Sequence, residues 1–236
     1  MIRGAIVCAV IAGVVQGCSS TETGNPPRTS TGISIDALSA MVISPFPPDG
    51  GSPAPGPTRL SGAPGALEPD ITSMRVVVWE STAPALIADR EGDGSFSVVV
   101  PRPNDGEIRL QAAGAADRRP PVDIQFSGSS IVPLPHPIGD CLDVPLEATL
   151  ASRTPPSDAA IVIRNDCGMD VSFAPPASRL GQLALDANPI VVGAGEQTTL
   201  VVSFGARATM DEDLLILSAT APTPDRRAVT VRVEEP

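Results

Sequence analysis

The chain has 236 residues, and its 27 prolines and 21 glycines argue against a helical protein, because both residue types destabilise helices. The formal net charge is −11, so a phosphate backbone would be repelled and we expect no nucleic-acid partner; all 16 basic residues are Arg. The absence of Lys excludes Schiff-base chemistry, a Walker phosphate loop and a Ser–Lys dyad.

Residues 1–17 are predicted to be an export signal. A charged start at Met1–Arg3 is followed by an apolar stretch from Gly4 to Val15. This stretch is shorter than the roughly 20 residues that a membrane-spanning helix needs. We therefore expect a chain that is exported and that does not span a membrane.

The signal ends in Val15-Gln16-Gly17-Cys18, which resembles the lipobox of bacterial lipoproteins. The resemblance implies cleavage before Cys18, a diacylglycerol on its thiol and acylation of the new amino terminus. Because Ser19 rather than Asp follows the Cys, it also implies sorting to the outer membrane, where several acyl chains give stable anchoring. The leaflet stays open, and the alternative is an ordinary secretory peptide with a chance Cys.

Residues 18–58 are predicted to be a lipid-anchored, flexible spacer. The polar segment Ser19–Pro26 buries too little surface to fold, and Pro45–Pro57 favours extended polyproline conformations. Within the spacer, Ile33–Ile35 and Ala40–Ile43 are candidates for a short strand that docks onto the first domain.

Residues 59–128 are predicted to form a small antiparallel β domain. Asp93-Gly94 indicates a hairpin between its second and third strands, because a tight turn needs residues that tolerate positive φ. Trp79 ends a β run and is expected in the core or at a sheet edge rather than in a binding platform. Short apolar blocks place the strands at Met74–Trp79, Ala85–Ala88, Ser95–Val100, Ile108–Ala112 and Val122–Phe126.

Residues 129–139 are Pro-rich and are expected to connect the first unit to a second β unit at 140–236. In the second unit Leu200, Val202 and Phe204 alternate with residues of the other strand face, and so do the valines of 228–233. Its strands are expected at Leu142–Leu150, Ala159–Arg164, Met169–Phe173, Gln182–Leu185, Thr198–Phe204, Leu214–Ala219 and Ala228–Val233.

Both units contain stretches that resemble immunoglobulin-like domains. Gly62–Pro69, Asp93–Phe96 and Gly106–Ala112 resemble bacterial immunoglobulin-like repeats, in which the Asp-Gly-Ser-Phe segment forms a hairpin and its Phe is buried. Ile161–Gly168 and Pro189–Phe204 are similar to the strand order of hydin-type and chaperone-type immunoglobulin-like domains. The expected fold class is all-β, with two small immunoglobulin-like antiparallel β-sandwich units after a disordered Pro-rich spacer.

The cysteines indicate one disulfide in the mature protein. Cys8 is removed with the signal and Cys18 is consumed by lipid, which leaves Cys141 and Cys167. An even remainder in an exported protein favours a bridge, worth about 3 kcal/mol in the chain-entropy model. Free buried thiols or a metal pair are the alternatives. On the immunoglobulin-like model the bridge pins the first strand of the second unit to its neighbour.

Two acidic clusters and the single His are the remaining candidates for chemistry. Asp89–Gly94 has the spacing that opens a calcium loop, but Val100 stands where the bidentate Glu is required, and a plain hairpin is the competing interpretation. Asp211–Asp213 is expected in a solvated loop between strands. His136 lies between two prolines in the connector, and a catalytic His needs a second group to fix its tautomer and a dry pocket, so we do not expect it to be a functional site.

The sequence contains no recognisable set of nucleophile, base and orienting residue, so we expect no enzyme, no cofactor and no metal site. It predicts a non-enzymatic cell-envelope protein held to the membrane through lipidated Cys18. The first hypothesis is a structural or accessory module that binds another envelope protein. The second is an outward-facing adhesin or a module that binds an extracellular ligand.

Overall fold

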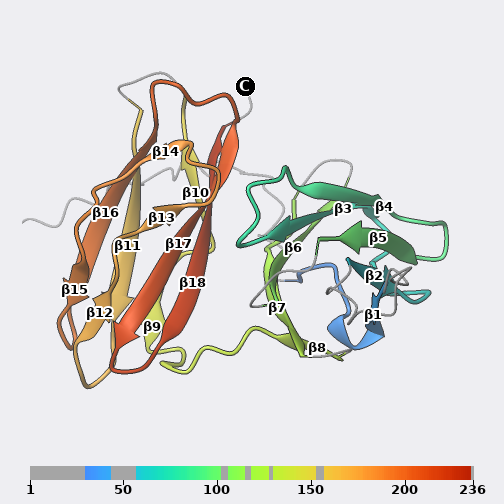
Figure 1. The fold of residues 1–236 in the computed structure, drawn as a ribbon, viewed down its shortest axis with the longest axis horizontal. Helices are drawn as coiled ribbons and strands as arrows, with labels where there is room; N and C mark the ends of the chain where they lie inside the picture. The colour runs from blue at the N-terminus through green and yellow to red at the C-terminus, as the bar shows by residue number, and fades with distance from the viewer. Residues whose placement is uncertain are drawn as a thin grey trace, which may run out of the picture.

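The computed structural model describes residues 30–43, 57–101, 106–114, 118–127, 130–152 and 157–234, and it confirms the all-β fold class. The described residues contain one 3-10 helix, η1 (Ile35–Ala37), and no helix among them is long and apolar enough to cross a membrane. Figure 1 shows the strands gathered into two β units that lie side by side and are joined by an extended connector.

The first unit is a sandwich of two sheets. The smaller sheet has the strand order β1-β2-β5 and the larger has the order β4-β3-β6-β7-β8. Leu60, Phe96, Met74 and Leu110 come from both sheets and are buried between them. The strands are β1 (Leu38–Val42), β2 (Thr58–Gly62), β3 (Ile71–Val78), β4 (Leu86–Asp89), β5 (Phe96–Val100), β6 (Glu107–Gly114), β7 (Val122–Ser127) and β8 (Ser130–Pro133).

This unit is longer at both ends than the expected 59–128. The predicted docking strand exists as β1, which pairs antiparallel with β2, and Ile33 forms a β-bridge with Leu67. At the other end β8 lies within the expected connector and pairs with β7. Both additions cover strand edges and extend the core, because an unpaired edge would leave backbone N–H and C=O groups without partners. The other parts of the expected spacer, residues 18–29 and 44–56, lie outside the described residues.

The turn at Asp93-Gly94 is present, but the predicted hairpin is wrong. The Glu91 N–H donates to the Ser95 carbonyl at 2.8 Å, and Gly94 has a φ of 86°. The strands on either side then separate, because β4 pairs with β3 in one sheet and β5 pairs with β2 in the other. The turn therefore links the two sheets, while Phe96 is buried as expected.

The second unit is also a two-sheet sandwich. One sheet has the order β10-β18-β17-β12-β15, with β13 also paired to β17, and the other has the order β14-β16-β11-β9. The strands are β9 (Leu142–Asp143), β10 (Glu147–Leu150), β11 (Ala159–Asn165), β12 (Val171–Phe173), β13 (Ala177–Ser178), β14 (Leu183–Ala184), β15 (Ile190–Val192), β16 (Gln197–Phe204), β17 (Glu212–Ala221) and β18 (Asp225–Val233).

The single strand expected at Leu142–Leu150 is two strands on opposite sheets. β9 pairs antiparallel with β11, whereas β10 pairs in parallel with β18, so the unit is not wholly antiparallel. Pro145 lies between them, and a proline cannot donate to a sheet ladder. The chain therefore crosses from one sheet to the other at this point.

A disulfide joins Cys141 to Cys167, with 5.0 Å between their Cα atoms, as the cysteine count predicts. Cys141 directly precedes β9 and Cys167 follows β11, and these strands pair with each other. The Asp166 N–H also donates to the Cys141 carbonyl at 2.8 Å. The bridge thus ties the first strand of the second unit to its neighbour.

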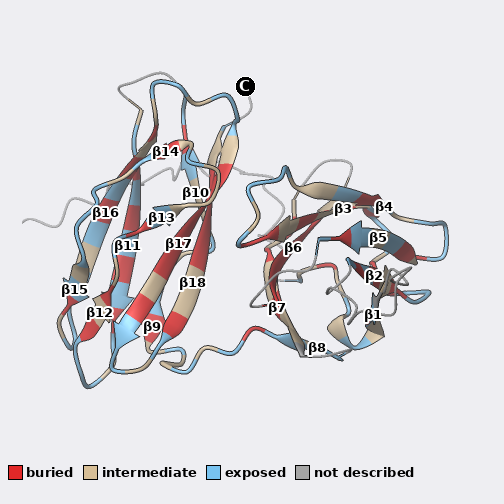
Figure 2. Cartoon of the chain, in the orientation of Figure 1, coloured by how far each residue is buried: buried red, intermediate tan, exposed pale blue. Residues whose placement is uncertain are grey.

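Burial in the two units departs from simple alternation where they face each other. All of Glu107–Ala112 in β6 is buried, although strand alternation points every second side chain away from the core of its own unit. The middle of β17 is buried in the same way, from Asp213 to Leu217. Figure 2 shows these continuous buried stretches on β6, β17 and β18, which face the other unit. The face that points away from its own unit's core is therefore covered in the sheet that contains β6 and in the sheet that contains β17.

Candidate functional site

Arg109 is the centre of the contact between the two units. It comes from β6, and only 1% of its side chain is exposed. Its Nε and one terminal nitrogen each donate to a carboxylate oxygen of Asp123, both at 2.7 Å. Asp123 is the register partner of Arg109 on β7, so this pair belongs to the first unit. A bidentate pair of this kind is one of the stronger polar interactions in proteins.

The other N–H groups of Arg109 donate to the second unit. They reach the Leu146 carbonyl at 3.0 Å, the Thr230 Oγ1 at 2.9 Å and the Ala228 carbonyl at 2.6 Å. All five N–H groups of the guanidinium therefore have an acceptor. Arg109 is a structural residue that joins β6 to β18.

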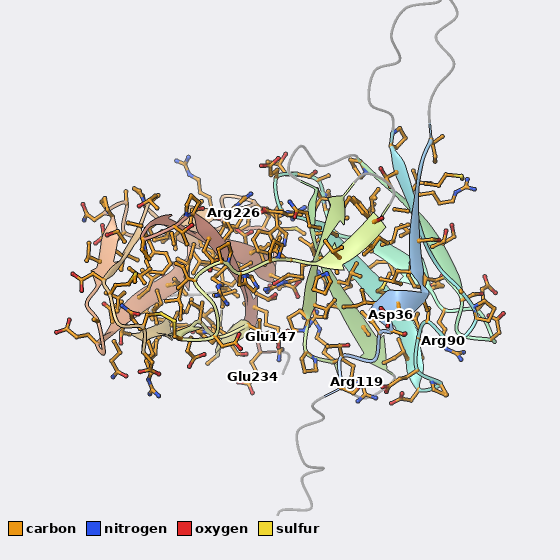
Figure 3. The ribbon with its side chains drawn as sticks, turned by 90° about the horizontal axis from the view of Figure 1, so that it is seen from below. Asp36, Arg90, Arg119, Glu147, Arg226 and Glu234 are labelled. Atoms are coloured by element: carbon orange, nitrogen blue, oxygen red, sulfur yellow. A yellow bond between two sulfur atoms is a disulfide. The ribbon has the colours of Figure 1, made fainter. Side chains whose placement is uncertain are left out.

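The first unit offers further polar side chains to the second. Arg75 and Arg118 both pair with Glu212, at 2.7 and 2.6 Å, so that one carboxylate lies between two guanidinium groups. Gln111 donates to Glu147 at 2.5 Å. Figure 3 shows Glu147 at the boundary between the units, whereas Asp36 and Arg90 lie on the opposite side of the first unit.

The second unit contributes two arginines to the contact with the first unit. Arg179 donates from Nε to the Val78 carbonyl at 2.7 Å and also to the Ala83 carbonyl. Burial lowers the pKa of Arg179 below its ordinary value, although the nearby charge of Asp213 opposes this shift. Arg226 pairs with Glu107, and its guanidinium carbon lies 5.6 Å from the centre of the Trp79 ring. The contacts between the units are therefore reciprocal.

An apolar cluster lies beside these polar contacts. Trp79 from the end of β3 and Leu134 from the connector pack with Leu214, Ile216 and Ala228 of the second unit. Trp79 is only 1% exposed, which agrees with its expected place in a core. That core is the one between the units. We call this contact between the units the joint. Burial of apolar area of this kind stabilises the joint, and the polar contacts fix its geometry.

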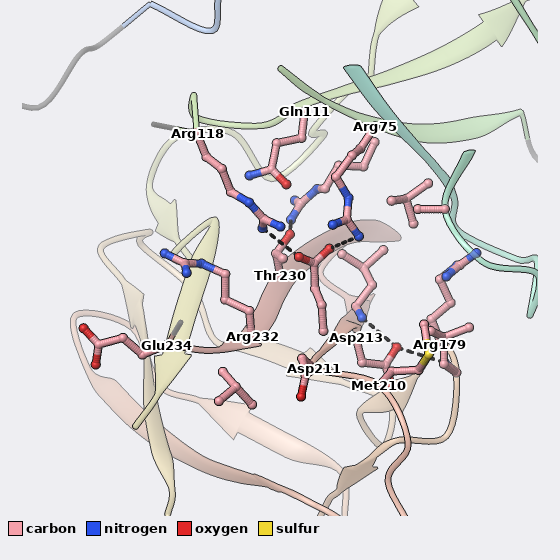
Figure 4. Close-up of a pocket in the computed structure, with 17 residues that line it drawn as sticks. Arg75, Gln111, Arg118, Arg179, Met210, Asp211, Asp213, Thr230, Arg232 and Glu234 are labelled. Carbon is pink, nitrogen blue, oxygen red and sulfur yellow. Dashed lines mark hydrogen bonds and ion pairs between the residues drawn. The ribbon is translucent and has the colours of Figure 1, made fainter. Parts of the chain in front are cut away.

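A cavity of about 360 Å³ that is partly open to solvent lies between the two units, beside this joint. Five arginines line it together with four acidic residues and several apolar side chains. Figure 4 shows Arg75 and Arg118 reaching in from the first unit, with Arg232 on the side of Glu234. The arginines are Arg75, Arg109, Arg118, Arg179 and Arg232, and the acids are Asp211, Glu212, Asp213 and Glu234.

The acidic cluster at Asp211–Asp213 is not the solvated loop that the sequence suggested. Glu212 and Asp213 belong to β17, and Asp213 is 3% exposed. Its carboxylate accepts the N–H groups of Leu180 and Gln182 at 2.9 and 3.0 Å. Asp213 therefore holds the 178–182 segment, and with it Arg179, against the first unit.

His136 has the orienting partner that the sequence did not reveal. Its Nδ1 lies 3.2 Å from Oδ1 of Asp225, whose side chain is fully buried. The other oxygen of Asp225 accepts the Ile138 N–H at 3.2 Å and pairs with Arg227 at 3.1 Å. His136 thereby fastens the connector to the start of β18.

The Asp89–Gly94 segment forms the turn between β4 and β5. Asp93 Oδ1 accepts the Ser95 N–H at 2.9 Å, and hydrogen bonding to the Ser95 side chain, followed by this backbone bond, lowers the pKa of Asp93 below its ordinary value. Among the residues that the structure describes, no three His, Cys, Asp or Glu side chains lie close enough together to hold a metal ion. Cys18, the predicted lipid-bearing residue, lies outside the described residues.

The cavity arginines were not identified as site residues from the sequence. Arg75, Arg109 and Arg232 stand at outward-facing positions of alternating strands, where a charged residue ordinarily faces water. The only available signal is the clustering of Arg, Gln and Thr on the outer faces of β3, β6 and β18. Sequence alone does not reveal that these faces meet.

No family model matches this chain, and no curated protein matches it. A protein of unknown function from Porphyromonas gingivalis W83 is 13% identical, with 83% of this chain and 99% of that chain covered and a TM-score of 0.31. A DUF3823 family protein from Bacteroides ovatus ATCC 8483 is 11% identical, with 70% and 91% covered and a TM-score of 0.22. The BSP domain of a biofilm associated protein is 12% identical, with 75% and 27% covered and a TM-score of 0.23. These similarities assign neither a family nor a function to the chain.

Proposed function

We propose that this protein is a non-enzymatic, lipid-anchored protein of the cell envelope of a Gram-negative bacterium, and that it binds another envelope protein. The lipobox-like segment at Val15–Cys18 supports the anchor and the outer-membrane location. The reciprocal contacts between the β units support a module that presents its outer strands in fixed positions.

The observation that carries this proposal is the edge strand β15. It pairs with β12, and no described strand pairs with its other edge. Val191 in its middle is 63% exposed, the largest exposed fraction among the large hydrophobic side chains that the structure describes. An open strand edge with an exposed apolar side chain is a recurrent site for adding a strand from a partner.

Crosslinking in intact cells tests this interaction. A photoreactive amino acid at Val191 is expected to capture one dominant envelope protein, identified by affinity purification and mass spectrometry through a tag after Pro236. The matched control carries the same photoreactive amino acid at Asp36, on the other unit and exposed. Equal capture at both positions, or no capture at Val191, would contradict a partner at this edge.

The anchor has a separate test. Cys18→Ala removes the thiol that would carry the diacylglycerol, so the variant is expected to leave the membrane fraction and appear in the soluble fraction. The measurement is immunoblotting of fractionated cells, with Cys8→Ala as the control because Cys8 would be removed with the signal. Retention of Cys18→Ala in the membrane fraction would refute lipid anchoring.

The cavity between the units favours a second candidate function, an outward-facing module that binds a ligand. Its volume of about 360 Å³ falls within the roughly 300–1,000 Å³ range of small-molecule sites. Protease added to intact cells should degrade the protein if it faces outward. Full protection, with degradation only after the outer membrane is opened, would place it on the periplasmic face.

A further inference from the structure

The arginines of the cavity differ in how completely their charges are compensated. Arg109 has a carboxylate partner in Asp123 and acceptors for every N–H group. Arg179 is held by two backbone carbonyls beside Asp213. These two residues are therefore fully committed to the joint between the units, and no ligand is needed to explain them.

The remaining three arginines are less well compensated. Arg75 and Arg118 share the single carboxylate of Glu212. No described residue pairs with the Arg232 guanidinium, and its Nε is buried without a hydrogen-bond partner. The Nε of Arg75 is buried without a partner as well. A buried N–H donor without an acceptor costs free energy, so the Nε groups of Arg75 and Arg232 favour an acceptor in the cavity, and the partly exposed guanidinium groups favour one that is anionic.

Arg75, Arg118 and Arg232 all line the same cavity. Arg232 is the register partner of Glu212 across β17 and β18, so both side chains leave the same sheet face next to each other. Glu212 already lies between Arg75 and Arg118. Figure 4 shows Arg75 and Arg118 reaching in from the first unit, whereas the Arg232 side chain extends to the side of Glu234. A ligand carboxylate in the cavity, which Arg232 also lines, would give the unused N–H groups of Arg232 an acceptor.

The rest of the cavity wall includes apolar side chains, contributed by both units. Val77 and Ala85 come from the first, and Leu180, Met210 and Val233 come from the second. A ligand that fills the cavity therefore needs an apolar body as well as an anionic group. Guanidinium groups match the planar, two-oxygen geometry of a carboxylate, which they bind through paired hydrogen bonds.

We propose that the cavity binds a small organic carboxylate with an apolar body, and that Arg232 is the main residue that recognises the carboxylate. This proposal deepens the second candidate function and rests on it. The same chemistry is offered by a free carboxylic acid and by the C-terminal residue of a peptide, and the probes below separate these sources.

The test is calorimetric titration of the full chain with four probes. N-acetylleucine carries the carboxylate as a peptide C-terminus does, 4-methylpentanoate carries it on the same apolar chain without the amide, N-acetylleucinamide lacks the charge, and inorganic phosphate lacks the apolar body. We expect N-acetylleucine to bind and the amide to bind at least about tenfold more weakly, since a charge-assisted hydrogen bond contributes about 1.5–3 kcal/mol. Tighter binding of N-acetylleucine than of 4-methylpentanoate would indicate a peptide C-terminus, and the reverse would indicate a free acid.

Variants locate the binding. Arg232→Gln is expected to weaken N-acetylleucine binding by about tenfold or more, whereas Arg164→Gln, an exposed Arg on β11 of the other sheet, should leave it unchanged. Unaltered Trp79 fluorescence in Arg232→Gln shows that the units remain joined. Equal binding of the amide, binding of phosphate alone, no binding of either carboxylate probe, or binding that survives Arg232→Gln would each overturn the proposal. None of these outcomes alters the protease sensitivity expected on intact cells for the second candidate function, so the failure of this proposal and the failure of that function are distinguishable.

Discussion

Arg109 occupies a position that faces away from the core of its own unit, and yet the second unit covers it almost completely. An isolated strand with this sequence would leave the guanidinium in water. The contact with Thr230 and the neighbouring carbonyls replaces that water with fixed acceptors. Burying the Arg109–Asp123 pair therefore makes the joint specific, since no other side chain offers the same set of donors.

Arg109→Met keeps most of the side-chain length and removes all five donors. We expect it to lower the free energy of unfolding by about 3–5 kcal/mol, because Asp123 then keeps a nearly buried charge without its partner. The measurement is urea unfolding followed by circular dichroism. Arg164→Met, on an exposed strand face, is the matched control and should change little. Similar losses of unfolding free energy in both variants would show that the buried Arg109–Asp123 pair contributes no more to stability than an exposed Arg does.

Asp225 makes the free energy of unfolding depend on pH in the acidic range. Burial is the largest influence and raises the pKa of Asp225, but the hydrogen bond with His136, the charge of Arg227 and the Ile138 N–H together lower it below its ordinary value of 3.8. A carboxyl with a lowered pKa in the folded state stabilises the fold above its unfolded pKa. That contribution is lost as the pH falls through the lowered value.

Asp225→Asn should therefore be less stable than the natural protein at neutral pH, with a difference that shrinks as the pH falls below about 4. Urea unfolding at a series of pH values between 2 and 7 would measure it. Asp36→Asn, an exposed carboxyl on η1, controls for the change in net charge. A stability difference that stays constant down to the lowest pH would argue against a charged Asp225 in the fold.

At the scale of elements, the turn at Asp93-Gly94 joins the two sheets of the first unit through its glycine. Gly94 has a φ of 86°, and a Cβ placed there would lie 2.7 Å from the Leu67 carbonyl oxygen. The same glycine accepts the Leu67 N–H at 3.0 Å, so the turn rests directly on the 62–67 loop. The residue is required both for its backbone conformation and for this close approach.

Gly94→Ala is expected to destabilise the protein by more than about 1 kcal/mol, because an alanine disfavours this φ and its methyl group meets backbone. Gly92→Ala, two residues earlier, meets no atom within 4 Å and should stay within about 0.5 kcal/mol of the natural protein. Thermal unfolding monitored by circular dichroism compares the two. Equal melting temperatures would mean that the turn adapts to a side chain.

Most strands were predictable because their sequences alternate over a half-buried surface. In β16, Leu200, Val202 and Phe204 are buried and Val201 is exposed, as the pattern indicates. The strands β2, β8, β13 and β15 were not predicted. The division of 142–150 into β9 and β10 depends on the choice of a sheet, which local sequence does not specify.

At the scale of the whole molecule, Trp79 reports whether the two units are joined. It is the only Trp of the chain, and it is buried among residues of both units. Ile216→Asp places a charge in this apolar cluster, so we expect the units to separate and the Trp79 fluorescence emission to shift to longer wavelength. A carboxylate without a partner is costly in an apolar environment.

The control for this variant is Val201→Asp, which replaces an exposed residue on the outer face of β16. It should leave the emission wavelength unchanged. Circular dichroism separates loss of the joint from global unfolding, because the strands of each unit are expected to persist. An unshifted emission in Ile216→Asp would show that the cluster does not hold the units together.

The sequence by itself determined the all-β class, the two-unit organisation, most strand positions and the pairing of Cys141 with Cys167, because alternation, turn residues and cysteine number are local properties of the chain. Only the tertiary structure decided that the outer faces of β3, β6, β17 and β18 meet. Their arginines look like ordinary solvent-facing residues until Glu212, Thr230 and the backbone carbonyls of the other unit lie opposite them. The cavity and its uncompensated Arg232 depend on positions distant in sequence, and local periodicity contains no information about such pairs.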